Sequence, residues 1–475
     1  MKSIGKNAIY NVVRQVSSIL FSLLLMPYVT RVLGSENYGK YSYCLSIVNY
    51  FMLISALGIS AYATREITAI REDKCKTKAI SSELFTINVV TTTISYILII
   101  VLLFIWNPTN EYKYIILILS VEIICQTLNR EWIYFIYEDY KFITIRTVIF
   151  QLIRLFAVFF IVKTKDDLLW FTIISVFCTV IICIINCFYT SKYIKFSITS
   201  KVNISQHLPP LLVIFLSSLV SSIYLNSDLT MLGIIKDDTD VGIYKVSTQI
   251  YGMVKTMLNA VVVVMIPRMA YYFKSNNIQE FRNLLARAFS SILIIVIPAM
   301  CGLIMVAKDI VYILAGDEYS RSIIPLQILS VALVFATIGN ICVSGVLITI
   351  KKEKSALGIA VISASCNVVF NIFMIPLISS IGAAITTLLS EMLVMTLGAY
   401  LAKQYIPFKG IIKPLFISFI GGTIICILCS LLNQLSLNVF LGLIIKIVIC
   451  AISYFGILVF IPDTRKLIRK IVKNN

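Results

Sequence analysis

Residues 8–64 read AIYNVVRQVSSILFSLLLMPYVTRVLGSENYGKYSYCLSIVNYFMLISALGISAYAT, and they contain two long apolar stretches, 8–32 and 42–64, separated by a short polar link. A helix needs about 20 mainly apolar residues to cross the roughly 30 Å of hydrocarbon in a bilayer. Both stretches reach that length, and the link is too short to hold a folded domain. The segment therefore predicts two transmembrane helices in succession.

Apolar stretches of similar length recur along all 475 residues, so we expect an all-α membrane protein of about fourteen transmembrane helices. The composition agrees, because 13% of the residues are charged, whereas a soluble domain carries about 25%. The expected spans are 8–32, 42–64, 82–106, 113–136, 141–162, 168–190, 208–233, 241–267, 286–307, 322–350, 355–377, 380–402, 411–432 and 437–461.

The net charge of +18 is explained by the side of the membrane on which Lys and Arg gather. In a soluble protein such a charge would suggest nucleic acid, but membrane proteins concentrate basic residues in their cytoplasmic loops. With a cytoplasmic N-terminus, the basic loop 65–81 and the basic tail after residue 461 both fall inside. We therefore expect a multi-pass protein of the lipid bilayer with both termini in the cytoplasm and no nucleic-acid partner.

The two halves of the chain carry a similar motif. RVLGSENYGKYSY (residues 31–43) follows the first span, and TMLGIIKDDTDVGIYKV (residues 230–246) follows the seventh. Each has Leu-Gly, a short acidic loop and Gly-x-Tyr. Repeats offset by six spans keep the same orientation, which predicts two six-helix lobes related by a pseudo-twofold axis along the membrane normal. The expected division is an N-terminal lobe 1–200, a C-terminal lobe 201–405, and two extra helices with a basic tail, 406–475.

Several spans carry polar residues at helical spacing, which places them on one face of each helix. Such faces form helix–helix hydrogen bonds or line a hydrated cavity, and both readings stay open for the serine-rich ones. A Lys or Arg in mid-helix costs about 2.5–3.5 kcal/mol to insert, which favours a cavity where cations are present. We expect Asp228 to offset one of those cations. The candidate cavity residues are Asn11, Arg14, Ser18, Asn49, Asp228, Lys245, Gln249, Lys255 and Asn259.

A second polar group lies in the fourth and fifth spans and contains both signs of charge. Because acids and bases occur together there, internal ion pairing within the N-terminal lobe is the favoured role. The group consists of Glu122, Gln126, Asn129, Arg130, Glu131, Thr147, Gln151 and Arg154.

Neither a metal site nor a catalytic centre is expected. Cys426 and Cys429 form a C-x-x-C inside an apolar span, without a second cysteine pair or a nearby histidine. The single histidine, His207, lies at the cytoplasmic start of a span. We therefore expect no cofactor and no enzyme activity, which leaves a membrane-bound polysaccharide polymerase or acyltransferase as a remote alternative.

Three stretches resemble the Wzx-type polysaccharide-repeat-unit flippases of the multidrug/oligosaccharidyl-lipid/polysaccharide superfamily. They are residues 11–66, which begin NVVRQVSSIL, EWIYFIYEDYKFITIR (131–146) and NVVFNIFMIPLISSIGAAITTLLSE (367–391). The resemblance implies a fold like that of the superfamily's multidrug (MATE) exporters. It also implies alternating access through a central cationic cavity lined by spans one, two, seven and eight.

The substrate that the resemblance implies is an undecaprenyl-diphosphate-linked oligosaccharide, which crosses the bacterial cytoplasmic membrane for capsule, O-antigen or exopolysaccharide synthesis. A polysaccharide polymerase and glycosyltransferases are candidate partners. The residues carried over to substrate binding are Asn11, Arg14, Asp228, Lys245 and Lys255.

Two transporters of the same fold are the nearest alternatives. An exporter of cationic drugs needs acidic residues in its cavity, whereas the charges here are mostly basic and suit a diphosphate. Lipid II flipping for cell-wall synthesis is a further alternative that the sequence leaves open.

Overall fold

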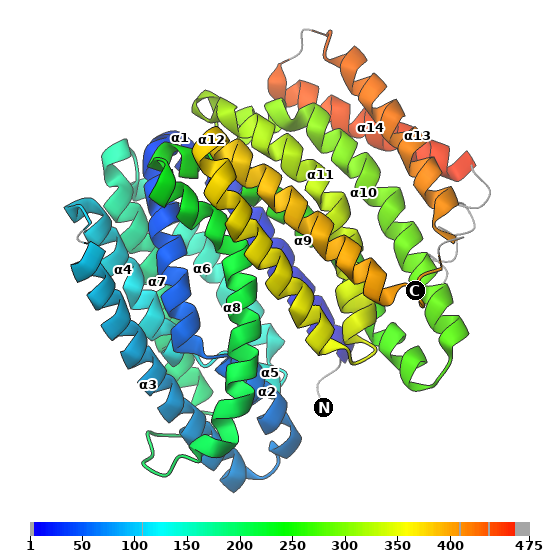
Figure 1. The fold of residues 1–475 in the computed structure, drawn as a ribbon. Coiled ribbons are helices and arrows are strands. Elements are labelled where there is room, and N and C mark those ends of the chain that lie inside the picture. Colours follow the sequence, from blue (N-terminus) through cyan, green and yellow to red (C-terminus); the bar gives the residue numbers. More distant parts are fainter. Residues whose placement is uncertain (1–3, 107, 408–409, 436–437, 461–475) are drawn as a thin grey trace. The chain divides into compact units, whose positions relative to one another are not determined.

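The computed structural model of the protein describes residues 4–106, 108–407, 410–435 and 438–460. The regular elements of these residues are all helical (Figure 1). The chain divides into two compact units, Met1–Gly242 and Ile243–Asn475, which we call unit 1 and unit 2. The basic tail expected after residue 461 lies outside the described residues.

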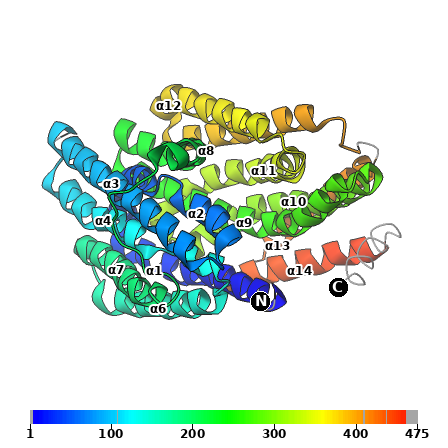
Figure 2. The ribbon, with the colours of Figure 1, turned by 90° about the horizontal axis from the view of Figure 1, so that it is seen from below.

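Unit 1 is built around the long helix α1 (Ile4–Ala56), which contacts α3, α4, α6 and α8. Figure 2 shows α6 and α7 lying beside α1 when unit 1 is viewed from below. The other elements are α2 (Ile59–Ile70), α3 (Lys74–Trp106), α4 (Asn110–Asn129), α5 (Trp132–Ile136), α6 (Tyr140–Ile161), the short turn η1 (Lys165–Asp167), α7 (Leu168–Thr190), α8 (Ile204–Ile235) and the start of α9 (Asp238–Lys274).

Unit 2 contains the rest of α9 and a row of packed helices. α10 contacts both α11 and α13, α11 contacts α12, and α14 contacts α10 and α13. The elements are α10 (Ile278–Leu314), η2 (Asp317–Ser322), α11 (Ile323–Asn340), the π-helical segment η3 (Ile341–Ile348), α12 (Glu353–Ala402), α13 (Ile412–Leu432) and α14 (Val439–Phe460).

Two of the predicted links between spans are bends within a single long helix. α1 turns at Gly34, whose φ of 75° lies in the left-handed region that glycine adopts without strain. α12 turns at Ile378 and Ser379, with φ values of −133° and 50°. The predicted spans on either side of each link therefore meet where the helix changes direction.

The surface of the helices confirms a multi-pass membrane protein. In the described residues, 11 helices are long and apolar enough to cross a membrane, and the bent helices α1 and α12 each cover two predicted spans. Large apolar side chains face outward, with Phe104, Phe160 and Phe188 exposed by 80%, 76% and 75%. In water such exposure would be unfavourable, but lipid tails solvate it. The count of fourteen spans stays a prediction.

The predicted span 113–136 is wrong at its C-terminal end. α4 stops at Asn129, and Arg130 takes a left-handed φ of 49° before α5 begins at Trp132. The Arg130 guanidinium lies 4.5 Å from the ring centroids of both Phe85 and Phe196. Stacking of the cation between two aromatic rings accounts for the break.

The boundary between the units differs from the boundary expected between the lobes. It lies within α9, after Gly242, and α8 belongs to unit 1. The reason is local packing of α8 on α1, where the hydroxyls of Ser46 and Thr230 are 2.9 Å apart. The division into lobes 1–200, 201–405 and 406–475 stays a prediction.

The Gly-x-Tyr glycines of the predicted repeat, Gly39 and Gly242, lie against each other in unit 1. A Cβ atom added to Gly39 would overlap the carbonyl oxygen of Asp238, and one added to Gly242 would overlap that of Ser35. Small residues of this kind let two membrane helices cross with their backbones in contact. The two motifs therefore meet at a single helix crossing, between α1 and the start of α9.

We predict that Gly39→Ala and Gly242→Ala each lower the stability of the protein by about 1–3 kcal/mol, because the added methyl group forces the backbones apart. Thermal unfolding in detergent measures the effect. Gly358→Ala in α12 is the matched control, since its Cβ would meet no described atom within 4 Å. Equal melting temperatures for all three variants would contradict the close crossing.

Candidate functional site

The polar face predicted for the first span forms a hydrogen-bonded row on α1. Arg14 Nη2 donates to Asn11 Oδ1 at 3.1 Å, and Ser18 Oγ donates to the carbonyl oxygen of Arg14 at 3.0 Å. Gln151 of α6 donates to Ser18 Oγ at 2.9 Å. The structure therefore brings together three predicted site residues and Gln151, which the sequence assigned to the ion-pairing group.

Arg14 is half-buried and has a neutral partner. No carboxylate among the described residues pairs with its guanidinium, and the Oε1 atom of nearby Gln151 is buried without a hydrogen bond in the described part of the chain. A cation in a membrane-spanning segment is unfavourable unless a partner, water or a ligand offsets its charge. The row on α1 thus presents donors and an uncompensated positive charge.

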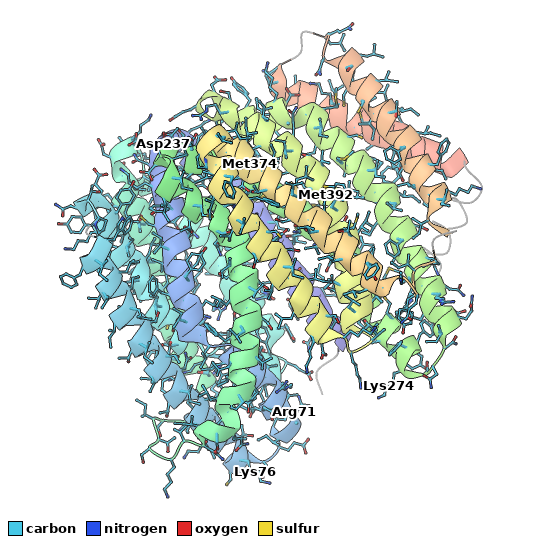
Figure 3. The ribbon with its side chains drawn as sticks, viewed as in Figure 1. Arg71, Lys76, Asp237, Lys274, Met374 and Met392 are labelled. Carbon is cyan, nitrogen blue, oxygen red and sulfur yellow. The ribbon has the colours of Figure 1, made fainter. Side chains whose placement is uncertain are left out.

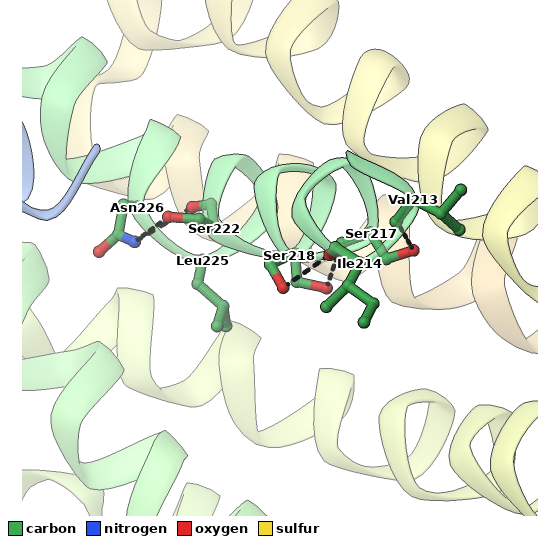
Figure 4. Close-up of a pocket in the computed structure, with 8 residues that line it drawn as sticks. Val213, Ile214, Ser217, Ser218, Ser222, Leu225 and Asn226 are labelled. Atoms are coloured by element: carbon green, nitrogen blue, oxygen red, sulfur yellow. Dashed lines mark hydrogen bonds between the residues drawn. The ribbon is translucent and has the colours of Figure 1, made fainter. Parts of the chain in front are cut away.

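The serine-rich face of α8 lines an open, shallow pocket of about 510 Å³ (Figure 4). Ser217, Ser218 and Ser221 each donate to a backbone carbonyl one turn earlier, at 3.0 Å. Their hydroxyl hydrogens are therefore used inside the helix, while the oxygen lone pairs remain as acceptors. Beside them lie apolar side chains such as Leu225, so this surface suits sugar hydroxyls better than an anion.

Asp228 lies on the same helix but is not one of the residues that line this pocket. Its side chain is buried, with 6% of the residue exposed. The predicted face of α8 therefore divides into pocket-lining serines and a buried carboxylate. The pairing of Asp228 with a cavity cation stays a prediction.

Lys255 of α9 forms an ion pair within unit 2. Its Nζ atom is 2.5 Å from Glu391 Oε1 of α12, and the Tyr251 hydroxyl donates to the same oxygen at 3.1 Å. Glu391 is not among the site residues predicted from the sequence. One signal was available, because Glu391 is the sole charged residue of the predicted span 380–402, and an acid at such a place needs a partner.

The other candidates on α9 have different surroundings. Lys245 and Gln249 are half-buried, and the Lys245 ammonium has no hydrogen bond or ion pair within the part of the chain that the structure describes. Asn259 accepts a hydrogen bond at 3.0 Å from Asn340, the N-cap residue of η3. The sequence did not indicate Asn340 as its partner. Asn49 is half-buried on the second segment of α1.

The predicted internal ion pairing of the N-terminal half is confirmed for Glu131. Arg146 of α6 lies 2.6 Å from Glu131 and also donates to Asn186 of α7 at 2.5 Å. In the C-terminal half, Lys446 of α14 pairs with Asp309 of α10 at 2.6 Å. Arg146 and Lys446 are therefore two buried cations that each have an acidic partner.

A family model described as polysaccharide biosynthesis protein matches residues 4–273, and a second model, MatE, matches residues 213–373. A candidate O-antigen transporter of Escherichia coli (strain K12) is 25% identical over 399 residues, covering 83% of this chain and 95% of that protein. The capsular polysaccharide biosynthesis protein CapF of Staphylococcus aureus is 25% identical over 411 residues, covering 84% and 99%.

Two solved structures share the fold. The lipid II flippase MurJ in an inward closed conformation matches with a TM-score of 0.77 and 18% identity, over 97% of this chain and 100% of that chain. An inward-facing multidrug MATE transporter of the MOP superfamily matches with a TM-score of 0.62 and 12% identity, over 83% and 97%. At these identities the likeness establishes the fold alone.

The first family model covers more than half of the 475 residues, and the fold agrees with it. The resemblance found in the sequence is therefore confirmed: this chain belongs to the polysaccharide biosynthesis protein family of multi-pass membrane transporters, with the fold of the MOP superfamily.

Proposed function

We propose that this protein is a flippase for undecaprenyl-diphosphate-linked oligosaccharide repeat units in capsule, O-antigen or exopolysaccharide synthesis. The observation that carries the proposal is Arg14, a half-buried cation in a membrane-spanning helix whose contact is the neutral amide of Asn11. A guanidinium binds phosphate through two parallel N–H bonds, which makes Arg14 suited to a diphosphate. The names of the relatives, an O-antigen transporter and a capsular polysaccharide protein, support the same substrate class.

The two chemical parts of the substrate match two kinds of surface. In unit 1 the diphosphate would bind to the uncompensated cation Arg14, while the sugars would lie on the neutral serine face of α8. In unit 2 Lys245 is a further cation that could bind a phosphate. Lys245 and Lys255 are ten residues apart, so their Cα atoms are separated by about 15 Å along α9. A single diphosphate would therefore meet these two lysines at different depths of its path.

Charge favours this substrate over a cationic drug. Arg14 and Lys245 are half-buried cations without an acidic partner in the described residues, and each would repel a cation and attract a phosphate. A lipid II flippase would use the same cations, and the lipid II flippase MurJ shares the fold. The relatives with capsule and O-antigen names favour a repeat-unit substrate. They are described as transporters and biosynthesis proteins, so transport and not catalysis is the proposed activity.

We place the protein in the cytoplasmic membrane of a bacterium, with both termini and the 65–81 loop inside. In unit 1, Arg71 and Lys76 lie at one end of the helices and Asp237 lies at the other, so the basic loop and the acidic link face opposite sides (Figure 3). Glycosyltransferases would then supply the loaded lipid at the basic side, and a polysaccharide polymerase would receive it at the acidic side.

The natural Cys75 tests this orientation without any substitution. It is exposed, whereas the other cysteines are buried or half-buried. We predict that an impermeant maleimide fails to label Cys75 in intact cells and labels it after the membrane is opened. Lys165→Cys, in the link between α6 and α7, is the control and should be labelled in intact cells. Strong labelling of Cys75 in intact cells would reverse the topology.

We predict that Arg14→Ala lowers surface polysaccharide by about 10- to 100-fold, since a hydrogen bond to a charged group contributes about 1.5–3 kcal/mol. Complementation of a flippase-null strain, with expression checked for each variant, is the measurement. Arg14→Lys should also be impaired, because an ammonium offers a point contact and not a fork.

The matched control is Arg31→Ala on the same helix, where the exposed guanidinium donates to the Pro27 carbonyl at 3.0 Å. We expect this variant to make normal polymer. Normal polymer from Arg14→Ala at normal expression would show that Arg14 does not bind the headgroup.

A further inference from the structure

In the ion pair between Lys255 and Glu391 the cation is the more exposed member. In the structural pairs of Lys446 and Arg146 the acid is the more exposed member. The Lys255 side chain is 23% exposed and the Glu391 side chain 5%, whereas Lys446 is 9% exposed and its partner Asp309 18%. Arg146 is likewise more buried than Glu131, at 6% against 27%. In the Lys255 pair the acid is fixed inside the unit, and the cation is the member that a ligand can reach.

Four hydrogen bonds join α9 to α12 around Glu391, and two of them are made by its carboxylate. The Tyr251 hydroxyl donates to the Glu391 oxygen that also accepts from Lys255, and Tyr251 itself is 7% exposed. About two turns earlier on α9, the Tyr244 hydroxyl lies 3.1 Å from the Thr387 hydroxyl and 3.3 Å from the Ala383 carbonyl oxygen. If Lys255 turned away, Tyr251 would still donate to the carboxylate, so the carboxylate would not lose all of its partners.

An anion beside Lys255 affects any second anion that approaches the same ammonium. While Glu391 is ionised, a phosphate at Lys255 gains one attraction and one like-charge repulsion, and the repulsion is strong where water is scarce. The carboxylate therefore weakens phosphate binding at this position. A transporter needs such weakening, because a substrate that is held tightly in every state is not released.

We propose that Glu391 is a positioning residue that competes with the diphosphate for Lys255. In the empty protein the carboxylate holds the ammonium. When substrate binds, Lys255 moves to the phosphate, and re-formation of the Lys255–Glu391 pair then drives the substrate off. This inference rests on the proposed function, because it requires that the substrate carry a phosphate.

The test measures headgroup binding and transport separately. Purified full-length protein in nanodiscs is titrated with undecaprenyl diphosphate and, for comparison, with neutral undecaprenol. Glu391→Gln should bind the diphosphate about tenfold more tightly, which is within the 5- to 150-fold range typical of coupling between two sites. The same variant should make less surface polymer, because release is slowed. Lys255→Met should bind more weakly.

Asp309→Asn is the matched control, since it removes the acid from the Lys446 pair and should leave diphosphate affinity unchanged. If Glu391→Gln binds the diphosphate as the wild type does, or more weakly, the inference is overturned while the proposed function stands. If the wild type binds undecaprenyl diphosphate no better than undecaprenol, the proposed function fails and the inference fails with it.

The exchange variant Lys255→Glu with Glu391→Lys decides the matter if Glu391→Gln does not fold. Competition predicts that the exchange restores a folded protein but not diphosphate binding, because the more accessible position 255 then carries a negative charge. Restoration of both binding and surface polymer by the exchange would show that the pair is structural.

Discussion

The free-energy cost of holding a charge inside a bilayer organises the polar residues of this protein. Arg146 and Lys446 offset that cost with carboxylates 2.6 Å away, and these pairs tie neighbouring helices together. Arg14 and Lys245 are half-buried without an acidic partner in the described residues, so their charge remains for a ligand. Lys255 stands between the two cases, because it has a partner but stays accessible. The proposed function rests on this difference between paired and unpaired cations.

The bilayer also determines how the helices meet. Lipid tails are as apolar as leucine, so helices associate through close packing and hydrogen bonds and not through a hydrophobic driving force. The contact of Gly39 with Gly242 is such a packing site, and it lies next to the boundary at which α9 passes into unit 2. Hydroxyl and amide groups on α1, α6 and α8 supply the hydrogen bonds, and the same groups give the proposed substrate path its neutral polar surface.

Hydropathy predicted most of the helices, because the length and apolar character of a span are local properties of the chain. It placed the links at which α1 and α12 bend, but it missed the break at Arg130, which depends on rings from two distant segments. The candidate site shows the same contrast between features set by local sequence and features set by tertiary packing. Helical spacing identified the row of Asn11, Arg14 and Ser18, whereas the pairing of Lys255 with Glu391 joins residues 136 positions apart. Partners of this kind are set by tertiary packing and cannot be read from spacing.

The most direct test of the account is a structure of the protein with undecaprenyl diphosphate bound, determined by electron cryomicroscopy in nanodiscs. The account predicts that diphosphate oxygens lie about 2.7–2.9 Å from the Arg14 guanidinium, the distance of a charge-assisted hydrogen bond. In that complex Arg14 would have left, or would share, its contact with Asn11. A headgroup bound elsewhere, with the Arg14–Asn11 contact unchanged and no phosphate near it, would contradict the central claim.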